Sequence, residues 1–193
     1  MKVWMIRHGK TVGNLESRYI GVTDQGLCKE GEEELKHNKK WLELTLDCVY
    51  VSPMLRCQQT AEILCNSHFK KEIIDGLKEC NFGLFENKNY KDLTGNQEYQ
   101  TWIDSGGNCI FPNGDDPVEF KKRSVKTFLH IIETATENKY QEIGIVTHGG
   151  TIMSIMEALA HPKKDFYTWH VPNGKGYTFF VENGNVIKEV KEI

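Results

Sequence analysis

The sequence predicts an α/β domain in which helices cover both faces of a mostly parallel sheet, a three-layer α/β/α sandwich. Short apolar runs alternate with amphipathic stretches along the chain, as in domains built around a parallel sheet. The 193 residues suit one domain with a sizeable core. The hydrophobic content of 39% and charged content of 26% are ordinary globular values. We therefore expect a single domain over residues 1–193.

The first half is predicted to contain two buried strands, Val3–Ile6 and Cys48–Val51. The charged stretch Lys29–Leu44 between them is predicted to be a helix, weakly amphipathic through Leu35 and Leu42. Ser52 and Pro53 are predicted to open the next helix, because serine suits the N-cap and proline the first helical position. The apolar face of that helix comprises Met54, Cys57, Ala61 and Leu64.

The periodicity breaks down over residues 77–116, which are rich in Gly and Asn. We interpret this stretch as an insertion of short helices and loops that faces the substrate as a lid or wall. Asp115 and Asp116 form a turn and helix start before Pro117. The helix from Pro117 has these residues facing inward: Val118, Val125, Phe128, Leu129 and Ile132. The remaining elements are a strand at Ile143–Val146, a helix at Thr151–Ala160, and a hairpin of Tyr177–Val181 with Val186–Val190 around Asn183-Gly184.

Charge and cysteine content narrow the class of protein. The formal net charge of -3 argues against a general nucleic-acid binder. The sequence shows no signal peptide and no apolar run long enough for a bilayer, so we expect no membrane partner. Six scattered cysteines without a CxxC pair are expected to be free thiols in a cytoplasmic protein: Cys28, Cys48, Cys57, Cys65, Cys80 and Cys109. Nothing in the sequence indicates the oligomeric state.

Three predicted strand ends lead into loops with unusual chemistry. They are Arg7-His8-Gly9, Ser52-Pro53 with Arg56 nearby, and Thr147-His148-Gly149-Gly150. Ligands of open α/β sheets bind outside the carboxyl ends of the strands, so we expect these segments to converge on one site.

A phosphate group would explain why positive charge gathers there. Arginine presents a planar fork that matches phosphate oxygens, and Thr11 and Asn14 add neutral donors. The glycines Gly9, Gly149 and Gly150 allow close backbone approach. A neutral histidine can attack phosphorus and form a covalent intermediate. A carboxyl group beside it would protonate the leaving alcohol.

Five motifs in order resemble the histidine phosphatase superfamily, which is also called the phosphoglycerate mutase-like family. They are Arg7-His8-Gly9 with Asn14, the segment Gly21-Val22-Thr23-Asp24, Ser52-Pro53-Met54-Leu55-Arg56 with Gln59-Thr60-Ala61, Leu77-Lys78-Glu79-Cys80-Asn81-Phe82-Gly83, and Thr147-His148-Gly149-Gly150. The matches span most of the chain. The resemblance implies the phosphoglycerate mutase-like α/β/α fold and a metal-independent, cofactor-free phosphomonoester hydrolase acting on a small phosphorylated metabolite.

The resemblance also implies roles for individual residues. His8 would be the phosphorylated nucleophile, and Arg7, Arg56 and His148 would hold the phosphate. Glu79 would be the proton donor, with Glu86 and Asp75 as the alternatives nearby. The predicted substrate-binding residues are Thr11, Asn14, Thr23 and Gly149.

Within the superfamily, the Leu77–Glu86 and Phe111–Asp115 segments are most similar to small phosphatases such as the α-ribazole phosphatases. Mutases carry Arg directly after the acidic Glu, where this chain has Cys80. A phosphatase is therefore favoured. The alternatives are phosphoglycerate mutase activity and a non-catalytic phosphate-ligand binding module. The chain departs from the small phosphatases at Cys28, Phe85, Asn87, Asp115 and Asp116, which leaves the substrate open among α-ribazole 5'-phosphate, a sugar phosphate and a small phosphorylated acid.

Overall fold

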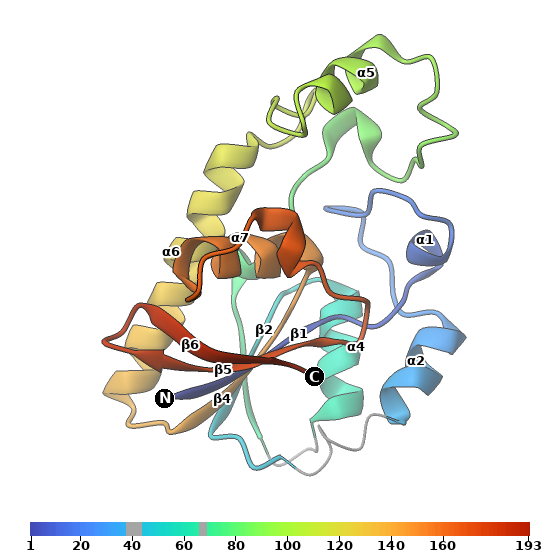
Figure 1. Ribbon diagram of the computed structural model, residues 1–193. Helices are drawn as coiled ribbons and strands as arrows, with labels where there is room; N and C mark the ends of the chain where they lie inside the picture. The colour runs from blue at the N-terminus through green and yellow to red at the C-terminus, as the bar shows by residue number, and fades with distance from the viewer. Residues whose placement is uncertain (38–43, 66–68) are drawn as a thin grey trace.

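A six-stranded sheet forms the middle of the molecule in the computed structural model, which describes residues 1–37, 44–65 and 69–193 (Figure 1). Its strands are β1 (Lys2–Arg7), β2 (Cys48–Val51), β3 (Lys70–Ile73), β4 (Glu142–Thr147), β5 (Gly176–Glu182) and β6 (Val186–Glu192). They follow the spatial order β3-β2-β4-β1-β5-β6. The pairs β2–β3, β2–β4 and β1–β4 are parallel, whereas β5 runs antiparallel to β1 and to β6. The predicted mostly parallel sheet is confirmed.

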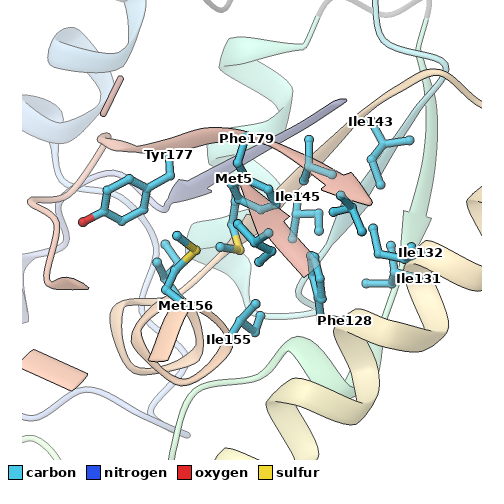
Figure 2. Close-up of a cluster of buried hydrophobic side chains, with 14 of the residues drawn as sticks. Met5, Phe128, Ile131, Ile132, Ile143, Ile145, Ile155, Met156, Tyr177 and Phe179 are labelled. Carbon is cyan, nitrogen blue, oxygen red and sulfur yellow. The ribbon is translucent and has the colours of Figure 1, made fainter. Parts of the chain in front are cut away.

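Helices cover both faces of this sheet. Successive side chains of a strand point to opposite sides, and because β1, β2 and β4 are apolar runs, both faces must be buried. Met5 of β1 and Ile145 of β4 pack against helices α6 (Pro117–Glu137) and α7 (Gly149–Leu159), as Figure 2 shows. The neighbouring residues Ile6 and Val146 pack on the other face, against α2 (Lys29–Lys36) and α4 (Leu55–Leu64). The three-layer α/β/α sandwich is therefore confirmed.

Helix α2 is shorter than predicted. It runs from Lys29 to Lys36 with His37 as its C-cap, and Leu44 lies in no helix. Residues 38–43, including Leu42, lie outside the described residues. Leu35 is buried against the sheet as expected.

Helix α4 begins at Leu55, so the prediction that Ser52 and Pro53 open it was wrong. Met54 is the N-cap, and the side chain of Asp24 accepts a hydrogen bond from the Leu55 amide at 2.8 Å. The cap thus comes from a segment distant in sequence, which local spacing does not reveal. The apolar face was predicted correctly, since Met54, Cys57, Ala61 and Leu64 are all buried.

Residues 77–116 contain short helices and loops, as predicted. η1 (Asp75–Leu77) leads into this region from β3, and its Leu77 is buried in the core against the sheet. η2 (Gly83–Phe85) and α5 (Gln97–Asp104) form a lobe beyond one end of the sheet, drawn in green at the top of Figure 1. The lobe has its own apolar cluster, made of Cys80, Phe85, Leu93, Phe111 and Phe120 with Tyr19, Phe82, Tyr99 and Trp102 packed against it.

Helix α6 begins at Pro117 as predicted, and the Asp116 side chain caps it by accepting from the Val118 amide at 2.8 Å. Phe128 and Ile132 are buried, and Val125 and Leu129 are half-buried. The inward placement of Val118 was wrong, because its side chain is 54% exposed. The first turn of α6 packs through Phe120 on the lobe cluster rather than on the sheet.

The C-terminal hairpin was predicted correctly. Asn183 and Gly184 have φ angles of 51° and 75°, the left-handed conformation that such a turn requires. Strand β3 was not predicted, because its sequence KKEI is charged and mostly exposed. The short elements α1 (Val12–Leu15) and η3 (Phe166–Trp169) complete the described structure. All six cysteines are free, and no described helix has the length and apolarity needed to cross a membrane.

Gly31 lets helix α2 approach the backbone that follows β1. A Cβ atom on Gly31 would lie 2.4 Å from the Lys10 carbonyl oxygen and 2.7 Å from the Lys10 nitrogen. Alanine gains about 1 kcal/mol over glycine in a helix, but overpacking costs about 1–3 kcal/mol. We expect Gly31→Ala to lower the free energy of unfolding in urea, because both clashing atoms belong to backbone. The exposed control Glu33→Ala should change it by less than about 0.5 kcal/mol. A more stable Gly31→Ala variant would contradict this packing.

Candidate active site

The three loops predicted to converge lie at one edge of the sheet. Arg7 at the end of β1 pairs with Thr147 at the end of β4, and Val51 at the end of β2 pairs with Val146. Backbone hydrogen bonds continue past the strands: the His8 amide donates to Thr147, and the Ser52 amide to Val146. His8, Ser52 and His148 therefore follow three adjacent parallel strands (Figure 1).

His8 is 4% exposed, and its geometry sets its tautomer. Its Nδ1 atom lies 2.7 Å from the carbonyl oxygen of Gly9. A carbonyl oxygen only accepts, so Nδ1 carries the hydrogen and Nε2 keeps its lone pair. Burial lowers the pKa of His8 well below its ordinary value, and the charges of Arg56 and Arg7 lower it further. The ring is thus a neutral imidazole whose Nε2 atom has a free lone pair.

His148 lies beside His8, with 5.2 Å between the ring centroids. It is fully buried, and its Nε2 atom is 2.8 Å from the hydroxyl oxygen of Ser52. The Sγ atom of Cys57 is 3.5 Å from the same nitrogen. Burial lowers the pKa of His148 well below its ordinary value, with Arg56 as the next cause. Two neutral histidines therefore stand side by side.

Arg56 is completely buried, and neutral backbone oxygens hold its guanidinium. Nη1 donates to the Thr23 carbonyl at 3.0 Å, and Nη2 to the Gly21 carbonyl at 2.8 Å. Its Nε atom is buried and has no hydrogen-bond partner among the described residues. An N–H group left in this state costs free energy unless a ligand accepts its hydrogen.

Arg7 repeats this arrangement from the end of β1. Its Nη1 atom donates to the Val171 carbonyl at 2.8 Å and lies 3.3 Å from Nε2 of His170. Its Nε atom is also buried without a partner in the described part of the chain. Burial lowers the pKa of Arg7, while Glu79 opposes this effect and Arg56 adds to it. Both arginines thus have a buried Nε–H group without an acceptor among the residues described. Such cationic donors suit an anion with several oxygens, such as phosphate.

Glu79 supplies a carboxyl group to the same place and is 8% exposed. One oxygen accepts from the Gly150 amide at 2.9 Å, and the other from its neighbour Cys80 at 3.1 Å. Burial raises the pKa of Glu79, although these two hydrogen bonds and the charges of Arg56 and Arg7 oppose the shift. A carboxyl group with a raised pKa keeps its proton to higher pH and can donate it.

Gly150 is needed for the approach of Glu79. A Cβ atom at this position would lie 2.5 Å from the Glu79 Oε1 atom. On the other side, Arg123 donates from Nη1 to the Lys78 carbonyl at 3.0 Å and from Nη2 to the Glu79 carbonyl at 3.2 Å. The backbone that carries Glu79 is therefore held between α6 and the start of α7.

The alternative acids are placed differently. The Asp75 side chain is 82% exposed and pairs with Lys78. Glu86 uses both oxygens to accept hydrogen bonds from backbone and hydroxyl groups of residues 21–23 and from Phe82. The geometry favours Glu79, whose carboxyl group interacts with both arginines of the site.

The side chains of Thr11 and Asn14 mainly make hydrogen bonds within the protein, which hold the chain around the site. Thr11 caps α1, and the Asn14 Oδ1 atom accepts from the Thr11 amide at 3.1 Å. Asn173 also donates to this oxygen at 3.2 Å, so the Asn14 amide nitrogen is the group that stays available to donate. The Thr23 hydroxyl is engaged by Glu86 at 2.7 Å, so Thr23 reaches the site through the carbonyl that holds Arg56.

Gly149 is the first residue of α7. A Cβ atom added to it would lie 3.4 Å from the Cζ atom of the Arg7 guanidinium. Gly149 therefore lies at the helix N-terminus, beside one of the two arginines. This end of a helix is favourable for an anion.

Sequence reasoning placed Ser52 in a converging segment but predicted the wrong role for it, and it missed two further residues of the site. Ser52 contacts His148 rather than capping a helix. The side chain of Asn173 donates to the His8 carbonyl at 3.1 Å, and His170 contacts Arg7. Both come from the segment before β5, where no motif marks them; only their place next to the β1 end in the sheet reveals them. Among the described residues, no group of three or more His, Cys, Asp and Glu side chains is placed to hold a metal ion.

The open donors of Arg7 and Arg56 predict that inorganic phosphate binds and stabilises the fold. A ligand present at 100 times its dissociation constant adds about 2.7 kcal/mol to the free energy of unfolding. The midpoint of thermal unfolding should rise with phosphate concentration for the unmodified chain. It should rise much less for Arg7→Gln, which removes one charge, and normally for the exposed control Lys122→Gln. An equal rise in Arg7→Gln would contradict this assignment.

Comparison with known proteins agrees with this geometry. An adenosylcobalamin/alpha-ribazole phosphatase of Escherichia coli is 27% identical over 179 residues, which cover 90% of this chain and 87% of that protein. A 2,3-bisphosphoglycerate-dependent phosphoglycerate mutase of Bartonella henselae is 28% identical over 165 residues, covering 80% and 79%. The crystal structure of the alpha-ribazole phosphatase from Shigella flexneri matches with a TM-score of 0.83 at 26% identity, covering 97% of this chain and 95% of that one.

The family model of the histidine phosphatase superfamily (branch 1) matches residues 3–190, nearly the whole chain. Its span includes both arginines, both histidines and the buried carboxyl group that meet at the edge of the sheet. The chain therefore belongs to the histidine phosphatase superfamily, branch 1.

Proposed function

We propose that this protein hydrolyses phosphate monoesters through a phosphohistidine on His8. The observation that carries the proposal is the state of that residue: a neutral ring whose Nδ1 hydrogen is bound to Gly9, so that Nε2 is the nucleophile. The unpartnered Nε atoms of Arg7 and Arg56 beside it supply donors for the phosphate oxygens. Membership of the superfamily and the phosphatases among its relatives support the same reaction.

The first step transfers the phosphoryl group to the enzyme. The His8 Nε2 lone pair forms the bond to phosphorus while the bond from phosphorus to the ester oxygen breaks. Glu79 gives its proton to that oxygen, and the alcohol leaves. The phosphorylated ring keeps its Nδ1 hydrogen on the Gly9 carbonyl, which stabilises the positive charge that develops on the ring.

The second step returns the enzyme to its starting state. Water attacks phosphorus, the Glu79 carboxylate takes a proton from it, and the nitrogen–phosphorus bond breaks. Inorganic phosphate leaves, and His8 is again neutral. Arg7, Arg56 and His148 stabilise the charge on the phosphoryl oxygens in both steps, and a single such donor commonly contributes about 10²–10³-fold in rate. No step requires a metal ion or cofactor.

The substrate is a small phosphorylated metabolite, and α-ribazole 5'-phosphate is the first candidate because relatives that cover the chain are named for it. The lobe of residues 77–116 would face the leaving group as an insertion within one domain over residues 1–193. A phosphoglycerate mutase is the weaker candidate. Cys80, which replaces the mutase arginine, is 4% exposed and packs in the lobe cluster, so it presents no charge to a substrate. The six free thiols suit the cytoplasm, which we propose as the location.

Removal of the nucleophile tests the reaction. His8→Asn should abolish hydrolysis of p-nitrophenyl phosphate and should leave no acid-labile phosphoenzyme after a quench with ³²P-labelled substrate. The unmodified chain should form it. The exposed His130→Asn serves as the matched control and should behave normally. Turnover by His8→Asn would overturn the mechanism, and an unmodified chain that binds phosphate without turnover would indicate the binding-module alternative.

Replacement of Glu79 tests its role as the acid, through the dependence of the rate on the leaving group and on pH. Because its pKa is raised, Glu79 loses its proton at a higher pH than an ordinary glutamate does. The lowered pKa of His8 keeps the nucleophile neutral well below pH 6.5. We expect kcat/KM to be highest on the acid side of neutrality and to fall as pH rises through the Glu79 pKa. Glu79→Gln should remove this fall and slow alkyl phosphates by about 10²–10⁴-fold, the usual contribution of a general acid.

Aryl phosphates, which have good leaving groups, are compared with the alkyl phosphates in the Glu79→Gln variant. p-Nitrophenolate leaves without a proton, so Glu79→Gln should slow its release far less. The comparison uses kcat/KM, which reports the first step alone, because loss of Glu79 also slows the water attack that both esters share. Equal losses of kcat/KM for the alkyl and aryl esters would show that Glu79 is not the acid. Glu98→Gln on the exposed face of α5 is the matched control.

A further inference from the structure

Glu86 holds together the loop of residues 21–23, which we call the arginine-holding loop. Its Oε1 atom accepts from the amides of Gly21 at 3.1 Å and Val22 at 3.0 Å. Its Oε2 atom accepts from Thr23 twice, from the amide at 3.3 Å and the hydroxyl at 2.7 Å. Three successive N–H groups thus converge on one carboxylate, an arrangement that binds anions strongly.

The same loop presents carbonyl oxygens to Arg56. Gly21 accepts from Nη2 at 2.8 Å, and Thr23 accepts from Nη1 at 3.0 Å. The loop therefore lies between a carboxylate, which takes its N–H groups, and a guanidinium, which takes its carbonyl groups. Because a guanidinium is a rigid planar fork, two bonds at its ends fix the direction of the remaining N–H groups.

Glu86 also ties this loop to the lobe. It lies at the end of η2, and its Oε1 atom accepts from the Phe82 amide at 3.0 Å. The loop packs tightly there, since a Cβ atom on Gly21 would lie 1.8 Å from the Cys80 carbonyl oxygen. That carbonyl belongs to the residue after Glu79. The Glu86 side chain thus joins the lobe to the arginine-holding loop, and the loop itself packs on the backbone next to Glu79.

We propose that Glu86 is a positioning residue for phosphate binding: it fixes the arginine-holding loop, whose carbonyl oxygens aim Arg56 at the phosphate. Glu86 acts through Arg56 and makes no contact with the reacting group. The proposal rests on the proposed function for its kinetic consequences, whereas the orientation of Arg56 can be tested by binding alone.

The carboxylate chemistry explains why a glutamate is required. A carboxylate offers only acceptors, and its charge-assisted hydrogen bonds are about twice as strong as neutral ones. Glutamine would turn two hydrogens of its own toward the N–H groups of the loop. Aspartate keeps the charge, but it is one methylene shorter and cannot reach every donor.

A double-mutant cycle tests the proposal. The dissociation constant of inorganic phosphate is measured by calorimetry for the unmodified chain, Glu86→Gln, Arg56→Met and the double variant, together with kcat and KM for p-nitrophenyl phosphate. We expect Glu86→Gln to weaken phosphate binding about tenfold and to raise KM by a similar factor, consistent with 1.4 kcal/mol per factor of ten. In the Arg56→Met background the same substitution should change phosphate binding less than twofold.

The control is another carboxylate of the lobe. Asp92 accepts from Arg18 at 2.8 Å and from the Asn89 amide at 3.2 Å, without contact to the arginine-holding loop. Asp92→Asn should leave phosphate binding unchanged. Glu86→Asp provides a milder change if Glu86→Gln unfolds, with an expected loss of about threefold, and its melting curve reports the folded fraction.

Each outcome is decisive. Equal losses from Glu86→Gln in both Arg56 backgrounds, or unchanged phosphate binding in both Glu86→Gln and Glu86→Asp, would overturn the positioning role. Absence of turnover in the unmodified chain would overturn the proposed function, while the phosphate-binding cycle would still decide the role of Glu86. The two failures are therefore distinguishable.

Discussion

Buried positive charge is the constraint on which the site depends. A guanidinium without solvent contact costs several kcal/mol in desolvation unless partners compensate it, and Arg56 is completely buried. Its hydrogen-bond partners are neutral carbonyl groups of residues 21 and 23. The Glu79 carboxyl group lies close by, and burial raises its pKa. The Nε–H group of Arg56 is left without an acceptor among the described residues, so the site favours a bound anion.

The buried setting and the two arginine charges together set the pKa values of the histidines beside them. Burial lowers the pKa values of His8 and His148, and the charges of Arg56 and Arg7 lower them further, so both rings are neutral. The Nε2 lone pair of His8 is free without a dedicated base, because the Gly9 carbonyl already accepts the Nδ1 hydrogen. Bound phosphate supplies negative charge in the ground state and in the transition state. The arginine charges thus favour a bound anion and neutral histidine rings, whereas the raised pKa of Glu79 comes from burial, against the effect of those charges.

Sequence patterns predicted the parts of the fold that local physics determines. Strands β1, β2 and β4 are continuous apolar runs, and Pro117 after Asp116 marks a helix start by itself. The errors arose where a distant partner decides: Asp24 sets the start of α4, and the lobe turns Val118 to solvent. The segments that the motifs mark lie together at one edge of the sheet. Asn173 and His170 join them only through tertiary contacts, which spacing along the chain does not encode.

The position of β1 in the sheet has a consequence for how the protein is made. The strand that precedes His8 is synthesised well before its partners, yet it lies between β4 and β5, with Lys2 opposite Glu142 and Phe180. At typical translation rates its first partner follows about 140 residues later, roughly ten seconds or more. Both edges of an apolar strand stay unpaired for that time, a state prone to aggregation. Because Asn173 and His170 contact His8 and Arg7, the site can assemble only after the segment before β5 has been synthesised.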